Sequence, residues 1–159
     1  ISCMKHFPGY GNNVDTHTGI SFDKREYSNF LTRDFVPFEE GIKNNAPTIL
    51  VSHNIVSCMD KDFPASLSKN VHDILKNDLN FSGIIITDDL AMDAVKSYVT
   101  DNSAAIQAVL AGNDMIISSD FKKQKDEVIN AINNNIIPIN LINNAVRKIL
   151  ACKIAYDII

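Results

Sequence analysis

The most constraining feature of this chain is an apolar, β-branched run at residues 83–87 that ends in the adjacent carboxylates Asp88 and Asp89. Such a run without polar alternation is typical of a strand buried on both faces of a parallel sheet. A helical pattern follows at residues 89–99. Catalytic groups in parallel α/β folds lie at the carboxyl ends of strands. We therefore expect Asp88 to take part in catalysis and Asp89 to cap the next helix.

Strand-like runs and helical patterns alternate along the chain. The other expected strands are residues 1–5, 48–52 and 114–118, and the other expected helices are residues 32–43, 67–79, 102–110, 122–133 and a last one after Pro138. This order predicts an α/β fold of parallel (β/α) units. A complete TIM-type (β/α)8 barrel needs roughly 250 residues. At 159 residues, the chain is expected to form about half of such a barrel.

Composition excludes several classes of protein. A formal net charge of −4 argues against nucleic acid as a partner. No apolar run is long enough to cross a membrane. The 3 cysteines are scattered and favour reduced thiols, and with them a cytoplasmic protein. The chain opens as if within a strand, so a fragment is expected. A signal or lipid anchor in a missing N-terminal part would instead make the intact protein secreted or anchored.

Polar residues gather after the predicted strands. Lys5 and His6 precede a Pro-Gly turn, and His53 follows the second strand. Asp15, two residues before His17, can accept from the imidazole and raise the basicity of its other nitrogen. Taken alone, the first pair also fits a stiff surface turn, and the second fits a turn cap with an exposed histidine. His72, within a helix, is expected to face solvent or to be partly packed. Neither a metal nor an organic cofactor is expected.

Several motifs together resemble the family 3 glycoside hydrolases, in their β-N-acetylhexosaminidase branch. They run in family order across nearly the whole chain. The matching segments are Lys5-His6-Phe7-Pro8-Gly9, Asp15-Thr16-His17, Val51-Ser52-His53, Pro64-Ala65-Ser66-Leu67-Ser68, Thr87-Asp88-Asp89-Leu90-Ala91-Met92, Ala111-Gly112-Asn113-Asp114-Met115 and Ala145-Val146-Arg147-Lys148-Ile149-Leu150. Tyr10 departs from the pattern, which commonly has histidine there.

The resemblance implies that residues 1–159 are the C-terminal half of the catalytic barrel domain. It implies Asp88 as the nucleophile and His17 as the acid/base, held by Asp15. Lys5 and His6 would bind the sugar, with His53 beside them as a further substrate-binding residue. The implied activity is a retaining exo-β-N-acetylglucosaminidase that removes terminal β-N-acetylglucosamine, typically from peptidoglycan fragments.

Other functions stay open at this point. An imidazole acid/base leaves no second carboxylate to repel an anion, so phosphate could replace water and make the protein a phosphorylase. A β-glucosidase-type member is disfavoured by the Asp-x-His pair and by the Asp-Leu that follows Asp88. An inactive sugar-binding or scaffold fragment is a third possibility. Because half a barrel leaves sheet edges open, we expect this chain to need the missing N-terminal half or self-association.

Overall fold

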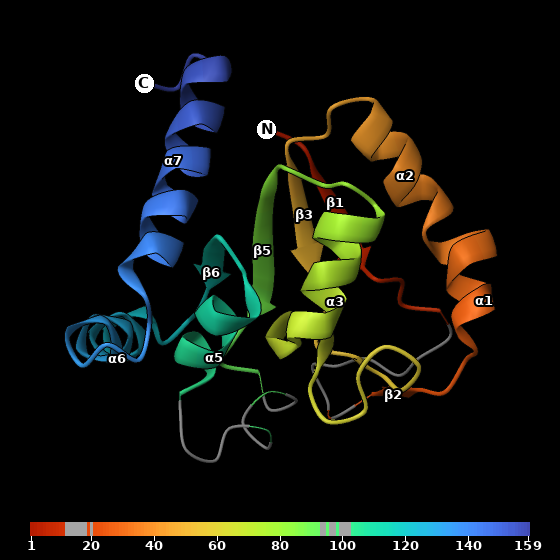
Figure 1. The fold of residues 1–159 in the computed structure, drawn as a ribbon, viewed down its shortest axis with the longest axis horizontal. Helices are drawn as coiled ribbons and strands as arrows, with labels where there is room; N and C mark the ends of the chain where they lie inside the picture. Colours follow the sequence, from red (N-terminus) through yellow and green to blue (C-terminus); the bar gives the residue numbers. More distant parts are fainter. Residues whose placement is uncertain (12–18, 20, 93–94, 96–97, 99–102) are drawn as a thin grey trace.

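The computed structural model describes residues 1–11, 19, 21–92, 95, 98 and 103–159 (Figure 1). Their main sheet has four strands, all parallel, in the order β1-β3-β5-β6. These strands are β1 (Cys3–Phe7), β3 (Thr48–Val51), β5 (Ile84–Asp89) and β6 (Met115–Ile117). A second, short parallel pair consists of β2 (Phe22–Asp23) and β4 (Ile55–Val56). The predicted α/β fold of parallel units is therefore confirmed.

The pairing of β3 with β5 forms the centre of the sheet. Thr48 lies opposite Ile84, and Val51 lies opposite Thr87, without a break in register. Every residue of β3 is buried, and so is most of the apolar part of β5. Burial on both faces explains why these segments read as continuous apolar runs. The residues that follow Val51 and Thr87 consequently lie at the same edge of the sheet.

Two strands extend further toward their carboxyl ends than the sequence predicts. Strand β1 runs to Phe7, which pairs with Val51, rather than ending at residue 5. Strand β5 runs to Asp89, which pairs with Ile117, rather than ending at residue 87. In both cases pairing with the neighbouring strand continues past the apolar run. The polar residues expected just after these strands are therefore part of them.

Helical segments follow the strands, as expected from the sequence (Figure 1). They are α1 (Tyr27–Asn29), α2 (Val36–Lys43), α3 (Lys69–Asp73), α5 (Ala104–Ala111), α6 (Phe121–Asn133) and α7 (Ile139–Ala155), with the π-helical turns η1 (Phe30–Asp34) and η3 (Ile74–Asp78) and the 3-10 turn η2 (Ala65–Leu67). Of the helix expected at residues 89–99, the first described residues belong instead to the end of β5 and to a turn, Val95 is helical, and residues 93, 94, 96, 97 and 99 lie outside the described residues. In the described part of the chain, no helix is long and apolar enough to cross a membrane.

Side-chain capping sets the start of two helices. Ser68 begins α3, where its Oγ accepts a hydrogen bond from the N–H of Val71 at 3.2 Å. Ser103 begins α5 in the same way, with the N–H of Ile106 at 3.3 Å. Helix α5 ends at Gly112, whose φ of 114° suits a residue without a Cβ. Serine is among the residues preferred at a helix N-cap, which explains why both helices begin at these positions.

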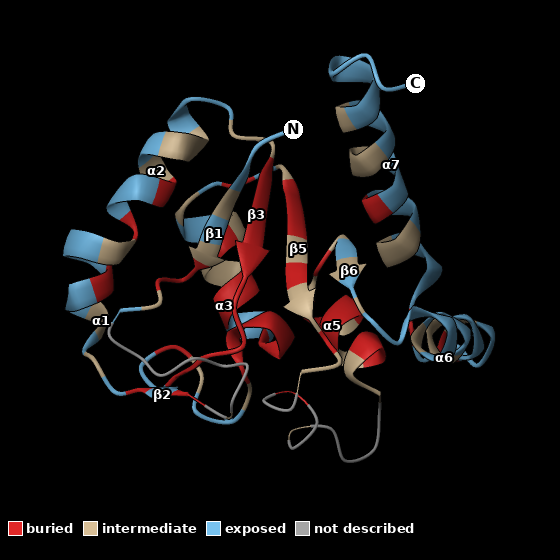
Figure 2. Ribbon diagram, turned by 180° about the vertical axis from the view of Figure 1, so that it is seen from behind, coloured by how far each residue is buried: buried red, intermediate tan, exposed pale blue. Residues whose placement is uncertain are grey.

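The core lies between the sheet and the helices beside it (Figure 2). Buried residues are concentrated on β3, β5, α3 and α5, whereas α6 and α7 are largely exposed. At the end of β1, the Phe7 ring stacks on Phe35 at 5.5 Å between centroids and meets Phe38 edge-on at 5.2 Å. This aromatic cluster fixes the carboxyl end of β1 against α2.

The structure corrects the expectation for His72, which is buried rather than facing solvent. Its Nδ1 lies 2.7 Å from the carbonyl oxygen of Ser68. The sequence pattern misses this burial because α3 is covered on that side by the end of α5. A Cβ built on Gly112 would lie 3.8 Å from the Cβ of His72. Desolvation lowers the pKa of His72 below its ordinary value of 6.5, against the hydrogen bond to Ser68, which raises it.

This burial predicts a loss of stability in mild acid. A lowered folded-state pKa means that the unfolded chain binds the proton more readily, so stability is complete above the unfolded value and falls as pH drops through it. We expect His72 to account for up to about 1.4 kcal/mol of the free energy of unfolding lost between about pH 7.5 and 5.5. Denaturant unfolding of the wild type and of His72→Gln at both pH values measures it. An equal loss in both proteins would contradict this assignment.

Candidate active site

The candidate site lies at the carboxyl ends of β1, β3 and β5 (Figure 1). The register of the parallel strands brings together residues that are far apart in the sequence. Lys5 and His6 belong to the end of β1, His53 follows β3, and Asp88 is the penultimate residue of β5. The structure thus collects four of the residues selected from the sequence at one edge of the sheet. Their roles in substrate binding and catalysis stay predictions.

Asp88 is a partly exposed carboxylate, with 23% of its side chain accessible. Its Oδ1 accepts a hydrogen bond from the N–H of Asp89 at 2.9 Å. Its Oδ2 lies 3.8 Å from Nε2 of His6, whose side chain is 30% accessible. A carboxylate that is held at one oxygen and reachable at the other has the geometry required of a nucleophile.

His6 is placed by its own strand and by the turn that follows. Its carbonyl oxygen accepts from the N–H of Gly9 at 3.0 Å, which closes the turn. Its ring meets Tyr10 in an edge contact with 5.6 Å between centroids. Tyr10, where the sequence departs from the family pattern, therefore packs beside the imidazole that faces Asp88. Lys5, next to His6, is exposed.

His53 lies beneath the site rather than on its open surface, with 1% of the residue accessible. Its Nδ1 is 2.7 Å from Oγ of Ser66, and its Nε2 is 3.0 Å from the carbonyl oxygen of Asp89. The structure thus joins the end of β3 to the end of β5 through this ring. The assignment of His53 to substrate binding stays a prediction from the sequence.

Asp15 and His17, the predicted acid/base pair, lie outside the described residues. Gly11 is the last described residue before them. Their assignment therefore stays a prediction.

Asp89 has a structural environment that differs from that of Asp88. Its Oδ1 accepts hydrogen bonds from the N–H groups of Ala91 at 2.9 Å and Ser119 at 3.0 Å. Burial would raise the pKa of Asp89, but these hydrogen bonds outweigh burial and lower the pKa below its ordinary value. The carboxylate closes the turn after β5 from within the strand, and not the start of a helix as expected from the sequence.

Sequence reasoning missed an ion triad that borders the site. The guanidinium of Arg25 pairs with Asp23 at 2.7 Å and with Asp34 at 2.9 Å, and it lies 4.4 Å from the ring centroid of Phe30. Asp23 is only 2% exposed. The desolvation cost of burying the two carboxylates is offset because one planar guanidinium forms ion pairs with both.

The turn after His6 packs against two side chains of this triad, those of Arg25 and Asp34. A Cβ built on Gly11 would lie 2.8 Å from Cζ of Arg25, and one built on Gly9 would collide with the carboxylate of Asp34. Both glycines have positive φ angles, 126° at Gly9 and 56° at Gly11. The two glycines were the sequence signal from which this contact could have been predicted, because glycine often occurs where the backbone closely approaches another group.

Metal binding has no support among the described residues. No group of three or more histidine, cysteine, aspartate or glutamate side chains in this part of the chain is placed to hold a metal ion.

The sequence matches the family described as Glycosyl hydrolase family 3 N terminal domain over residues 1–152. The chain belongs to this family. Similar curated relatives include a protein named beta-hexosaminidase from Nitrosomonas eutropha, 34% identical over 133 residues, which are 83% of this chain and 38% of that protein. Another of the same name, from Psychromonas ingrahamii, is 36% identical over 121 residues, 74% of this chain and 36% of that protein. This chain thus spans less than two-fifths of the length of these relatives.

Solved structures agree with this family. A glycoside hydrolase family 3 beta-N-acetylglucosaminidase from Paenibacillus sp. is similar with a TM-score of 0.88 and 28% identity, over 95% of this chain and 30% of that chain. A beta-N-acetylhexosaminidase from Beutenbergia cavernae is similar with a TM-score of 0.82 and 27% identity, over 95% of this chain and 46% of that chain. The fold is thus that of part of a family 3 N-terminal domain.

The contact between the turn and the triad predicts a strong effect of Gly9→Ala on stability. The new Cβ must displace Asp34, and alanine is strained at a φ of 126°. We expect a loss of about 2 kcal/mol or more in the free energy of unfolding. Gly41→Ala in α2 is the matched control, because the atoms nearest to its Cβ belong to the flexible side chain of Met4. That variant should stay within about 1 kcal/mol of the wild type. Equal losses in denaturant unfolding would contradict the proposed contact.

Proposed function

We propose that this chain carries the catalytic residues of a retaining exo-β-N-acetylglucosaminidase. The main support is the position of Asp88, a partly exposed carboxylate at the end of a central strand, 3.8 Å from the imidazole of His6. Membership of the family and the names of the relatives point to the same class of reaction. The substrate is a saccharide with a terminal β-N-acetylglucosamine, such as a peptidoglycan fragment.

In the proposed reaction, a carboxylate oxygen of Asp88 attacks the anomeric carbon of the sugar. The bond to the leaving oxygen breaks, and that oxygen takes a proton from the imidazolium of His17. Asp15 orients the imidazole and stabilises its charged form. Water then gives a proton to His17 and attacks the anomeric carbon, which releases Asp88. Two displacements at one carbon retain its configuration.

Lys5 and His6 are proposed to hold the sugar beside the nucleophile. The two belong to the end of β1, and the imidazole of His6 faces the carboxylate of Asp88. An imidazole and an ammonium can both donate hydrogen bonds to sugar hydroxyl groups. Donors fixed by a strand rather than by a loop hold the anomeric carbon in a narrow range of positions, which favours attack.

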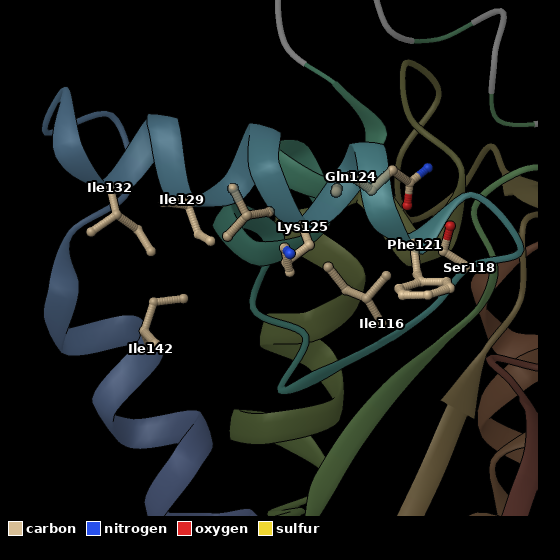
Figure 3. Close-up of a pocket in the computed structure, with 10 residues that line it drawn as sticks. Ile116, Ser118, Phe121, Gln124, Lys125, Ile129, Ile132 and Ile142 are labelled. Atoms are coloured by element: carbon tan, nitrogen blue, oxygen red, sulfur yellow. The ribbon is translucent and has the colours of Figure 1, made fainter.

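Completion of the site is proposed to require barrel segments outside this chain. Among the described residues, β1 and β6 each pair on one side only. Beside β6, an apolar groove is lined by Ile116, Phe121, Ile129 and Ile142 (Figure 3). Phe121 and Ile129 are largely exposed. The chain matches only 38% of its Nitrosomonas eutropha relative. Segments equivalent to the rest of that relative are the proposed partner of this surface.

A chimera tests the proposed function. The matched part of this chain replaces its counterpart in the Nitrosomonas eutropha protein, and release of nitrophenol from the β-N-acetylglucosaminide is measured, with the β-glucoside as a control. We expect activity on the first substrate only, and none from the 159-residue chain alone. Asp88→Asn should lower kcat by at least about 10³-fold, because it removes the nucleophile.

Asp126→Asn is the matched control, since this carboxylate is exposed on α6, far along the chain from the site. It should leave the activity unchanged. A folded chimera without activity, or an Asp88→Asn variant that keeps it, would contradict the proposal. Identifying the sugar product in phosphate buffer separates hydrolysis from phosphorolysis, because the phosphorylase would release sugar 1-phosphate.

A further inference from the structure

The side chains of the two residues that flank Asp88 accept hydrogen bonds from β6 and from the segment directly after it. The hydroxyl oxygen of Thr87 accepts a hydrogen bond from the N–H of Ile117 at 3.1 Å. The carboxylate of Asp89 accepts from the N–H of Ser119 at 3.0 Å. These two side chains hold the end of β5 to β6 and to Ser119, immediately before and immediately after Asp88. In this stretch the pairing of β5 with β6 is irregular.

On the opposite side, β5 is held by His53. Nε2 of the ring lies 3.0 Å from the carbonyl oxygen of Asp89, which can only accept, so this nitrogen carries a proton. Nδ1 lies 2.7 Å from Oγ of Ser66 and, in the neutral ring, accepts a hydrogen bond from this hydroxyl. The two hydrogen bonds are compatible with a neutral imidazole in a single tautomer, and both partners keep the ring in one orientation.

These contacts form a continuous series of hydrogen bonds that ends at the nucleophile. The hydroxyl of Ser66 donates to His53, and His53 donates to the carbonyl of Asp89. The N–H of the same Asp89 donates to Oδ1 of Asp88 at 2.9 Å. Because the N–H and the carbonyl belong to one residue, holding the carbonyl restricts the direction in which the N–H points.

We propose that His53, oriented by Ser66, is a positioning residue that acts on Asp88 through the backbone of Asp89. This inference rests on the proposed function, in which Asp88 is the nucleophile. The N–H of Asp89 holds Oδ1 and thereby fixes the rotation of the carboxylate, so that the other oxygen stays directed at the sugar. His53 does not touch the substrate. It is 1% exposed, and both of its ring nitrogens are engaged by protein groups.

The proposal predicts a specific kinetic signature. A misplaced nucleophile slows chemistry without weakening ground-state binding, and displacement by about 1 Å can cost about 100-fold in rate. A residue that binds the sugar would instead raise KM and the inhibition constant of the product. The change in kcat relative to these constants therefore separates a positioning role from direct substrate binding.

The experiment uses His53→Phe and His53→Gln in the active chimera. Phenylalanine fills the space but donates no hydrogen bond, whereas the glutamine amide can still donate to the carbonyl of Asp89. We expect His53→Phe to lower kcat about 30-fold or more, with KM and the inhibition constant of N-acetylglucosamine within about twofold of the wild type. His53→Gln should lower kcat less: the logarithm of its fall in kcat should be at most about two-thirds of that of His53→Phe.

Ser66→Ala keeps the ring and removes only its hydroxyl partner, so it tests the proposal if His53→Phe fails to fold. We expect a smaller fall in kcat, about three- to tenfold, again without a change in KM. A second measurement needs no activity: nitrogen–proton correlation spectra of the folded chimera should show His53 as the neutral Nε2–H tautomer near pH 7.

Four results would overturn the inference. They are a raised inhibition constant in His53→Phe, an unchanged kcat in a folded His53→Phe or Ser66→Ala chimera, a glutamine variant as slow as the phenylalanine variant, and an Nδ1–H tautomer or imidazolium in the spectra. A failure of the proposed function is distinct from all four. It would appear as an inactive wild-type chimera, or as an Asp88→Asn variant that stays active.

Discussion

The in-register parallel pairing of β3 with β5 is the constraint on which the candidate site depends. With Val51 opposite Thr87, the residues that follow each strand must lie at the same edge of the sheet. This register brings the ring of His53 within 3.0 Å of the backbone of Asp89, although 36 positions separate them in the sequence. The pairing is stable because both strands are buried, so a shift by one residue would place polar groups in the core.

At the end of β5, neighbouring residues divide two tasks between them. Asp88 keeps a partly accessible carboxylate, whereas the side chains of Thr87 and Asp89 bind β6 and the segment directly after it. Successive side chains of a strand point to opposite faces, which separates the group that can react from the groups that fasten the strand. An Asp-Asp pair in the sequence thus contains one carboxylate available for chemistry and one committed to structure, and only the hydrogen bonds distinguish them.

The sequence was sufficient for the features that depend on local pattern. Continuous apolar runs predicted the strands of the main sheet, and helical spacing predicted most helices, whereas the short strands β2 and β4 were not predicted. What it could not supply depends on contacts between distant segments. His72 is buried because α5 covers it, and the pairing of Arg25 with Asp23 and Asp34 needs the folded geometry around the turn. The same limit applies to His53, whose contacts with Ser66 and with the backbone of Asp89 join segments far apart in the sequence.

The amino end of the sheet offers a comparison that supports the assignment of the nucleophile. There Asp114 accepts from the N–H of Ile85 at 2.9 Å and pairs with Lys148 at 3.0 Å, and the carboxylate is 8% exposed. Lys148 also donates to the carbonyl of Gly83, so this ion pair joins α7 to the start of β5. The charge of Asp114 is compensated at Oδ2 by the ammonium and the N–H, and its low exposure leaves little of the carboxylate accessible to a substrate. Asp88, at the other end of β5, has a more accessible carboxylate whose Oδ2 faces His6, which supports its proposed role as the nucleophile.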